Sequence, residues 1–258
     1  MSSPLLTARG LGLVRGRRTL LDALEFSLTA GQCWAVLGRN GSGKTTLLHT
    51  LAGLLPPVNG ELELEGRPVG AWSRRALARE VGVLFQDEPA DFPATVLETT
   101  LTGRHPHLGP FASESDADRR TAHAALAAVD LGGLEARAVH TLSGGERRRL
   151  GVARLLTQDP RIYLLDEPTN HLDPHHQLAV LDQVVARARA RQGATLMSLH
   201  DVNLALRYCD HLLLLFGDGS WLAGAAGDIL DTAVLERLYG QAVVSLHAPD
   251  GRTVYVPR

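Results

Sequence analysis

The stretch GRNGSGKTT, residues 38–46, constrains the fold of this chain more than any other part of the sequence. It matches G-x-x-x-x-G-K-[ST], a pattern in which a glycine-rich backbone cradles phosphates, a lysine reaches them and a hydroxyl binds Mg²⁺. The pattern carries weight when a strand precedes it and a helix follows it. The apolar run at residues 31–38 predicts a buried strand, and the leucine spacing at residues 45–55, before Pro56, predicts a helix. The sequence therefore predicts a phosphate-binding loop in an α/β fold.

The same alternation continues along the chain. Apolar runs at residues 161–168 and 193–201 predict further buried strands, and the spacing at residues 175–193 predicts a helix between them. Strands that alternate with helices predict a mainly parallel sheet. Residues 87–155 are rich in alanine, leucine and charged residues and predict a helical insertion. The end of the chain predicts a short helix near residues 233–239 and a last pair of strands.

Composition excludes several classes of protein. The formal net charge of −2 gives no broad basic field, so we expect no nucleic-acid partner, and we expect residues 147–149 to form the polar face of a helix. The sequence has no leader pattern and no apolar run of about 18 residues, so we expect a chain that neither spans a membrane nor is exported. The two cysteines, Cys33 and Cys209, are expected to be thiols in a reducing compartment.

Two acids, Asp166 and Glu167, follow the apolar run in RIYLLDEP. Open α/β sheets bind their ligands at the carboxyl ends of the strands. One acid at such an edge can hold a metal ion while the next orients a water molecule for attack on a phosphate. We therefore expect Asp166 to be a direct or second-sphere partner of Mg²⁺, and Glu167 to be the general base or water-positioning residue.

A second helix start with phosphate-binding character lies at LSGGE, residues 142–146. Ser143, Gly144 and Gly145 are expected to open a helix whose backbone N–H groups and dipole attract an anion. Residues 38–46 are already expected to bind the phosphates of one nucleotide. The same nucleotide does not require a second phosphate-binding helix start at residues 142–146.

Five stretches occur in the order GRNGSGKT, LFQDEP, LSGGE, YLLDEPTNHLD and SLHD. Together, and over nearly the whole chain, they resemble the nucleotide-binding subunit of ATP-binding-cassette (ABC) transporters. The resemblance implies one nucleotide-binding domain over residues 1–258, with a P-loop NTPase (RecA-like) core, a mainly parallel sheet, an antiparallel β subdomain and an inserted α-helical subdomain. It implies a core and β subdomain at about residues 1–86 and 156–258, and a helical subdomain at about residues 87–155.

The resemblance also implies roles for single residues. Gln86 corresponds to the glutamine that senses Mg²⁺ and the membrane partner, and His200 to the histidine that bonds the γ-phosphate. Arg15 stands where the family usually has an aromatic residue on the adenine, and a guanidinium also stacks on a base. The implied catalytic residues are Lys44, Gln86, Glu167 and His200. The implied Mg²⁺ ligands are Thr45, Gln86 and Asp166. The implied nucleotide-binding residues are Arg15, Gly38, Arg39, Asn40, Gly41, Ser42, Gly43, Lys44, Thr45, Thr46, Ser143, Gly144, Gly145 and Asp173.

In this family two subunits pack head to tail, and each ATP lies between the phosphate-binding loop of one subunit and the LSGGE-type signature of the other. The resemblance therefore implies a homodimer in which the second cradle binds the partner's nucleotide. It also implies ATP and Mg²⁺ as cofactors, integral membrane permease subunits as partners, and a peripheral position on the cytoplasmic face of the inner membrane.

Residues 96–109 and 227–240 resemble importers of iron siderophores, haem and cobalamin, which also depend on a periplasmic or surface substrate-binding protein. Within that group the overall likeness leans towards cobalamin. One alternative stays open, a soluble cytosolic ABC ATPase such as one for iron–sulfur cluster assembly. The stretch GRHPHLG, residues 103–109, argues against it.

Overall fold

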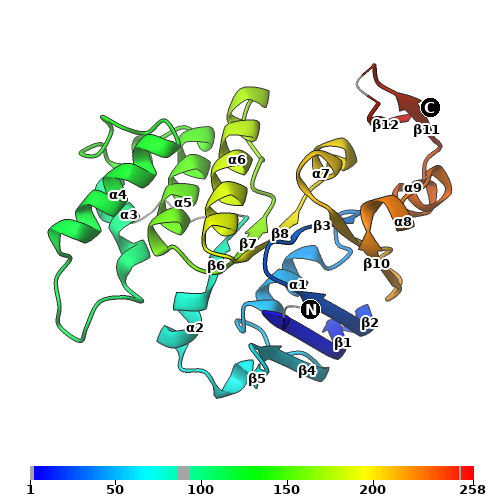
Figure 1. Cartoon of the computed structure of the whole chain (residues 1–258), viewed down its shortest axis with the longest axis horizontal. Coiled ribbons are helices and arrows are strands. Elements are labelled where there is room, and N and C mark those ends of the chain that lie inside the picture. Colours follow the sequence, from blue (N-terminus) through cyan, green and yellow to red (C-terminus); the bar gives the residue numbers. More distant parts are fainter. Residues whose placement is uncertain (1–2, 87–92, 250) are drawn as a thin grey trace. The chain divides into compact units, whose positions relative to one another are not determined.

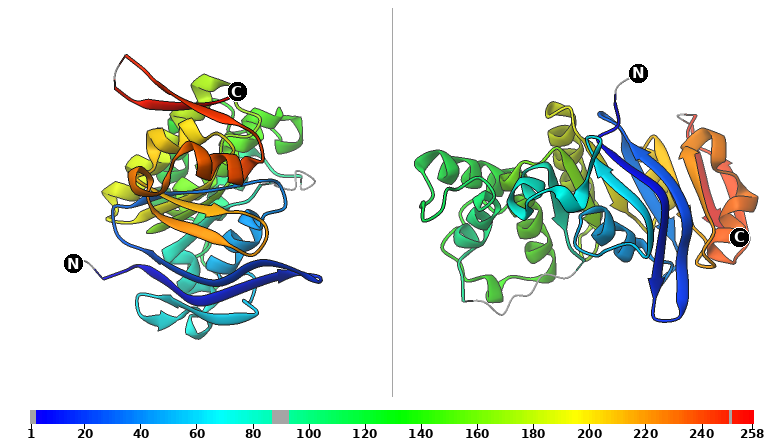
Figure 2. Two further views of the ribbon diagram at one scale, coloured as in Figure 1. Left: turned by 90° about the vertical axis from the view of Figure 1, so that its right-hand side faces the viewer. Right: turned by 90° about the horizontal axis from the view of Figure 1, so that it is seen from below.

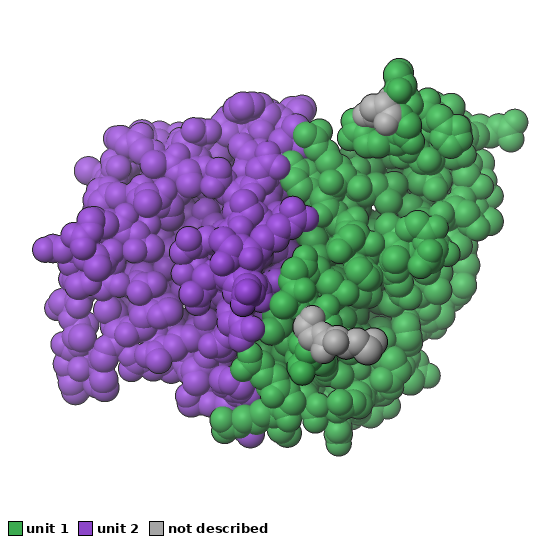
Figure 3. All heavy atoms as spheres, in the orientation of Figure 1, with its two compact units in different colours: residues 1–69, 196–258 green, residues 70–195 purple. Residues whose placement is uncertain are grey.

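The computed structural model describes residues 3–86, 93–249 and 251–258 of the chain (Figure 1). The chain divides into two compact units, which Figure 3 distinguishes by colour: unit 1 is Met1–Val69 with Leu196–Arg258, and unit 2 is Gly70–Thr195. Asp87, Glu88 and Pro89 of the LFQDEP stretch lie outside the described residues. The expected boundaries of the subdomains, at about residues 86 and 156, stay predictions.

Unit 1 contains the first strands and the C-terminal part of the chain. Its elements are β1 (Leu6–Arg15), β2 (Arg18–Leu28), β3 (Cys33–Gly38), α1 (Lys44–Leu51), β4 (Asn59–Leu64), β5 (Arg67–Pro68), α7 (Val202–Tyr208), β9 (His211–Leu215), β10 (Trp221–Ala225), α8 (Ala226–Ile229), α9 (Thr232–Tyr239), β11 (Val243–His247) and β12 (Thr253–Pro257). Strand β8 (Ala194–Ser198) and the short helix η1 (Val69–Ala71) contain the points where the chain passes between the units.

An antiparallel sheet with the strand order β2-β1-β4-β5 forms the N-terminal part of unit 1. Strands β1 and β2 make a long hairpin, in which Leu6 lies opposite Leu28 and Arg15 lies opposite Arg18 (Figure 2). The turn between them contains Gly16, whose φ of 63° suits glycine. The leucines of both strands are buried together with Ala8 and Phe26, while Arg9 and Glu25 are exposed, which gives the sheet one core face.

Strand β3 is buried along its whole length, and this explains its continuously apolar sequence, CWAVLG. Strand β9 pairs with it in parallel, with Gly38 opposite Leu215, and β10 pairs antiparallel with β9. On the other side of β3, the N–H of Leu199 donates to the carbonyl of Val36 at 3.2 Å. The expected buried strand therefore ends at the first glycine of the phosphate-binding loop.

Helix α1 follows that loop, as expected, but it is shorter than the leucine spacing predicts. It ends at Leu51, whereas the sequence predicted a helix up to Leu55. Gly53 has a left-handed φ of 69°, and the N–H of Leu54 donates back to the carbonyl of His49 at 2.9 Å. A left-handed glycine with such a bond is a common helix terminator, so Gly53 ends this helix before Pro56 is reached.

Unit 2 contains the helical insertion and the strands on either side of it. Its elements are α2 (Arg74–Glu80), β6 (Val81–Leu84), α3 (Val96–Leu101), η2 (Thr102–Arg104), α4 (Asp116–Ala128), η3 (Val139–Thr141), α5 (Gly144–Gln158), β7 (Ile162–Asp166) and α6 (Pro174–Ala190). Strands β6 and β7 are parallel, with Val81 opposite Ile162 and Leu84 opposite Leu165. The described residues between 93 and 158 form helices and loops, as the composition predicted.

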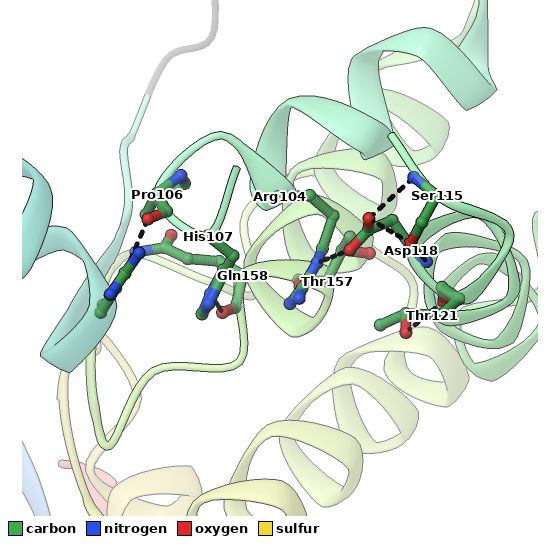
Figure 4. Close-up of polar contacts among 10 residues, drawn as sticks. Arg104, Pro106, His107, Ser115, Asp118, Thr121, Thr157 and Gln158 are labelled. Atoms are coloured by element: carbon green, nitrogen blue, oxygen red, sulfur yellow. Dashed lines mark hydrogen bonds and ion pairs between the residues drawn. The ribbon is translucent and has the colours of Figure 1, made fainter. Parts of the chain in front are cut away.

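Helices α3, α4 and α5 pack against one another (Figure 1, green). Each helix begins with a capping box, which satisfies N–H groups of the first turn and so defines where the helix starts. The capping pairs are Thr95 with Glu98, Ser115 with Asp118, and Ser143 with Glu146. Polar contacts also join the helices (Figure 4). Arg104 bonds the carboxylate of Asp118 at 2.7 Å and the carbonyl of Thr157 at 3.1 Å. These contacts fix α5, and with it the helix start at Ser143.

Candidate nucleotide-binding site

The loop between β3 and α1 has the backbone that a phosphate cradle needs. Gly41 and Gly43 have φ values of 77° and 106°, which a residue with a Cβ adopts only at a cost. A Cβ at Gly38 would lie 2.7 Å from the carbonyl oxygen of Leu215, so this position has no room for a side chain. Gly43 is the N-cap residue of α1, and among the described residues no side chain caps the helix there. The start of α1 is therefore arranged to meet an anion.

Lys44 is the only lysine in the sequence, and it lies at the first position of α1. Its side chain is 6% exposed, and Nζ donates to the carbonyl of Gly38 at 2.8 Å and to that of Arg39 at 3.3 Å. The ammonium is thus folded over the loop itself. Thr45 and Thr46 beside it are half-buried, whereas Arg39, Asn40 and Gly41 are exposed at the tip.

Two other predicted residues of unit 1 lie at the ends of strands. Arg15 ends β1 and is exposed beside the hairpin turn. His200 follows β8 and is exposed. Leu199 before it is buried, and Asp201 after it is the N-cap residue of α7. Both positions leave the side chains accessible to a ligand.

In unit 2, the structure brings Gln86 and Glu167 into contact. Asp166 ends β7 and is fully buried, and Glu167 is 8% exposed with a left-handed φ of 50°. The Oε2 atom of Glu167 accepts a hydrogen bond from Nε2 of Gln86 at 3.1 Å and another from Nδ2 of Asn170. The carboxylate is therefore oriented by amide donors from different segments. Asn170 was not predicted, although it lies within the quoted stretch YLLDEPTNHLD.

The signature sequence opens α5, as predicted. The Oγ atom of Ser143 accepts from the N–H of Glu146 at 3.2 Å, and the Glu146 carboxylate accepts from the N–H of Ser143 at 2.7 Å. The backbone N–H of Ser143 is the main cause that lowers the pKa of Glu146. A Cβ at Gly145 would lie 3.0 Å from the carbonyl oxygen of His171, so this glycine allows the chain before α6 to approach the helix start.

Asp173 is the N-cap residue of α6. Its Oδ1 accepts from the backbone N–H of His176 at 2.9 Å, and its Oδ2 contacts Nδ1 of the same histidine at 2.8 Å. The hydrogen bond from the His176 backbone is the main cause that lowers the pKa of Asp173, and the His176 side chain adds to it. In the structure, Asp173, which the sequence predicted to bind nucleotide, caps the N-terminus of α6.

The expectation that residues 147–149 form a polar face is wrong for Arg148, which is 6% exposed. Its guanidinium donates to main-chain carbonyls at the ends of β6 and β7, and these hydrogen bonds offset the cost of burying the charge. Arg149, the next residue, donates instead to the carbonyls of Val129 and Asp130, each at 2.8 Å.

Comparison with known proteins identifies the family. A family model described as "ABC transporter" matches residues 21–170. The hemin import ATP-binding protein HmuV of Pseudomonas entomophila (strain L48) is 40% identical over 260 residues, which cover 98% of this chain and 100% of the relative. The chain belongs to the ABC transporter family. It is an ATP-binding cassette and an ATPase.

Other ABC relatives agree with this assignment. The achromobactin transport ATP-binding protein CbrD of Dickeya dadantii (strain 3937) is 36% identical, over 91% of this chain and 87% of the relative. A solved metal-chelate type ABC transporter in an inward-facing conformation superposes with a TM-score of 0.85 at 28% identity, covering 99% of this chain and 98% of that one. These matches confirm the predicted fold class, a P-loop NTPase of the α/β type. In the part of the cassette that the structure describes, no helix is both long and apolar enough to cross a membrane.

Proposed function

We propose that this ABC ATPase is the energy-supplying subunit of an importer for a metal-chelate cargo, with haem as the first candidate. The observation that carries the proposal is the 40% identity with a hemin import ATP-binding protein along the full length of both chains. The achromobactin relative supports a siderophore as the second candidate. These two relatives favour haem or a siderophore over cobalamin, towards which the sequence alone leaned.

The proposed chemistry is hydrolysis of ATP by a positioned water molecule. The glycine loop and Lys44 hold the phosphates, because the loop offers backbone N–H groups and the ammonium supplies charge. Glu167 orients the attacking water, and its hydrogen bond to Gln86 supports this role by fixing one carboxylate oxygen. In the proposal His200 bonds the γ-phosphate and Arg15 stacks on the adenine; both are exposed in unit 1.

The residues that the proposal assigns to Mg²⁺ carry oxygen donors. The Thr45 hydroxyl, the Gln86 side-chain carbonyl and the Asp166 carboxylate are hard oxygen ligands of the type that this ion prefers. Gln86 uses its Nε2 for Glu167, so its Oε1 is the atom available to a cation. When bound, the ion would neutralise charge on the phosphates.

We propose a head-to-tail homodimer in which Ser143, Gly144 and Gly145 of one subunit bind the ATP held by the loop of the other. The helix start at Ser143 supports this role, because the positive end of the α5 dipole and the N–H groups of Gly144 and Gly145, which the capping box does not use, suit an anion at this position. Asp173 belongs to the same proposed interface. The remaining partners would be integral membrane permease subunits and, indirectly, a periplasmic or surface substrate-binding protein, with the ATPase peripheral on the cytoplasmic face of the inner membrane.

Affinity purification from the native cell would test the transporter assignment. The tagged chain, carrying Glu167→Gln to slow ATP turnover, is extracted from membranes with mild detergent, and the proteins that accompany it are identified. A many-helix integral membrane protein is the expected result. Soluble assembly proteins without a permease would overturn the importer and favour a cytosolic ABC ATPase, for example one for iron–sulfur clusters.

Growth of a deletion strain would test the cargo. Cells that lack the gene are supplied with haem, a siderophore or an iron salt as the iron source, and with or without cobalamin where growth requires it. The proposal predicts a defect on haem that is restored by the wild-type gene and not by a Lys44→Ala variant. A defect on the siderophore alone, or on cobalamin alone, would reassign the cargo.

A further inference from the structure

Arg148 lies on α5 with its guanidinium directed at the ends of two neighbouring strands. Its Nη1 donates to the carbonyl oxygens of Phe85 and Gln86, which follow β6. Its Nη2 donates to the carbonyl of Asp166 at the end of β7, and its Nε to that of Pro168 at 3.3 Å. An arginine has enough donors in one rigid plane to bind all of these carbonyls together, whereas a lysine ammonium donates from a single point.

These hydrogen bonds hold the main chain on both sides of Glu167. The carbonyls that accept from Arg148 include those of the residue before Glu167 and of the residue after it. Glu167 itself has a φ of 50°, in the left-handed region that residues with a Cβ disfavour. Such a conformation persists only where its surroundings hold it. The guanidinium is therefore placed to maintain the backbone from which the Glu167 carboxylate projects.

The same guanidinium holds the other partner of the carboxylate. The main-chain carbonyl of Gln86 accepts from Nη1 of Arg148 at 3.3 Å, while the Gln86 side chain donates to Glu167. Removal of Arg148 would release both ends of the hydrogen bond between Gln86 and Glu167. Arg148 of α5 thus contacts the main chain on both sides of this hydrogen bond.

We infer that Arg148 is a positioning residue that sets the Glu167 carboxylate for attack by water and couples it to the helix that begins at the signature sequence. This inference rests on the proposed role of Glu167 in ATP hydrolysis and goes beyond it. Since α5 begins at Ser143, whose proposed ligand is the ATP of the partner subunit, Arg148 carries the position of that helix start directly to Gln86 and Glu167. Turnover at one site would then respond to occupancy of the other.

Steady-state ATPase kinetics of the full-length protein would test this role. The variants are Arg148→Gln and Arg148→Lys. The matched control is Arg149→Gln, because Arg149 is the next residue on the same helix and also donates to main-chain carbonyls, those of Val129 and Asp130. Arg148→Gln is expected to lower kcat by about 10- to 100-fold, because small misplacements of catalytic groups have effects of that size. Its KM and its affinity for a fluorescent ATP analogue should change by less than about threefold, because the phosphates are assigned to Lys44 and the glycine loop, of which Arg148 is not a part.

The comparison among variants separates positioning from general damage. Arg149→Gln is expected to keep the wild-type kcat, and Arg148→Lys, which retains the charge, is expected to recover only part of the rate. If Arg148→Gln does not fold, Arg148→Lys carries the same test. A wild-type kcat in Arg148→Lys and Arg148→Gln, or an equal loss in Arg149→Gln, would overturn the inference. A Glu167→Gln variant that hydrolyses ATP at the normal rate would instead overturn the proposed function itself.

Discussion

The Nε2 atom of Gln86 donates a hydrogen bond of 3.1 Å to the Oε2 atom of Glu167. This bond joins the end of β6 to the end of β7, and Asn170 adds a second amide donor to the same carboxylate oxygen. These two donors hold the carboxylate in one orientation, which is what a water-positioning residue requires.

Replacement of Glu167 by glutamine is expected to trap an ATP-bound dimer. Glutamine has nearly the same shape and can still accept a hydrogen bond from Gln86, but it is a poor base, so turnover should fall by about 10²-fold or more. The two signature sequences would then hold their nucleotides without release. Light scattering in saturating ATP and Mg²⁺ should report twice the monomer mass.

The double variant Glu167→Gln with Lys44→Ala is the control for this trap. Loss of the Lys44 ammonium weakens phosphate binding, so the double variant is expected to stay monomeric under the same conditions. A monomer in both variants, or a dimer in both, would count against a dimer held together by ATP.

Because Lys44 is the only lysine in the sequence, an amine-selective reagent reports on the phosphate-binding loop directly. Lys44 is 6% exposed, with Nζ bonded to the loop carbonyls, so acetylation should be slow and saturating ATP with Mg²⁺ should slow it further. Mass spectrometry can follow the acetyl group on the peptide that contains Lys44, with the α-amino group as an internal reference. Equal acetylation of Lys44 with and without ATP would show that the ammonium does not meet the phosphates.

The local parts of this structure could be predicted from the sequence. The buried strand, the glycine loop and the start of α1 depend on neighbours within a few residues, and so does the cap at Ser143. The predicted end of α1 was wrong because the leucine spacing continues past Gly53, whose left-handed backbone ends the helix. Leu54 and Leu55 are therefore exposed in a loop although they fit the helical pattern.

The contacts that orient Gln86 and Glu167 could not be predicted in this way. Arg148 was expected on a polar face because charged residues usually are, and its burial depends on carbonyls that lie 63 and 18 positions away in the sequence. Gln86 and Glu167 are 81 positions apart, and only the pairing of β6 with β7 brings them together. The acid pair after an apolar run predicted a role for Glu167, and the resemblance to the family predicted one for Gln86, but neither predicted the contact between them.

Asp118 gives unit 2 a pH-dependent share of its stability. The Ser115 hydroxyl is the largest cause that lowers the pKa of Asp118 to about 2; the Ser115 backbone N–H and Arg104 add to it (Figure 4). Because the folded pKa lies below that of the unfolded chain, the stabilisation is fully present above about pH 5 and is lost as the pH falls towards 2. At pH 7 it amounts to about 2 kcal/mol.

Asp118→Asn is therefore expected to lower the free energy of unfolding by about 2 kcal/mol at pH 7, and by roughly half as much at pH 3. Urea denaturation of the wild-type protein and the variant across this pH range measures the difference. Asp116→Asn is a matched control, because Asp116 lies in the same first turn of α4 without the capping bonds of Asp118. A difference between wild type and Asp118→Asn that does not change with pH would show that the carboxylate charge is not responsible.

Cys33 and Cys209 lie 3.4 Å apart, Sγ to Sγ, in the interior of unit 1. Cys33 begins β3 and Cys209 follows α7, so the fold of unit 1 creates their contact. The hydrogen bond with Cys33 is the first cause that raises the pKa of the Cys209 thiol well above its usual range, and burial is the second. Only a thiolate reacts rapidly with alkylating reagents, and both side chains are buried away from solvent. Cys209, by its raised pKa and burial, and Cys33, by its burial, should therefore be unreactive towards a maleimide in the native protein between about pH 7 and 9.

Both thiols should become reactive only when unit 1 opens, and therefore together. Brief alkylation at increasing urea concentrations, followed by intact-mass measurement, is expected to show molecules with no label or with both, and few with one. The labelled fraction should follow the unfolding curve from circular dichroism. If one cysteine reacts rapidly in native buffer, the contact between β3 and the end of α7 opens without unfolding of unit 1. In that case saturating ATP, whose proposed site includes the loop after β3, should slow the reaction, because a ligand that binds only the closed form suppresses opening.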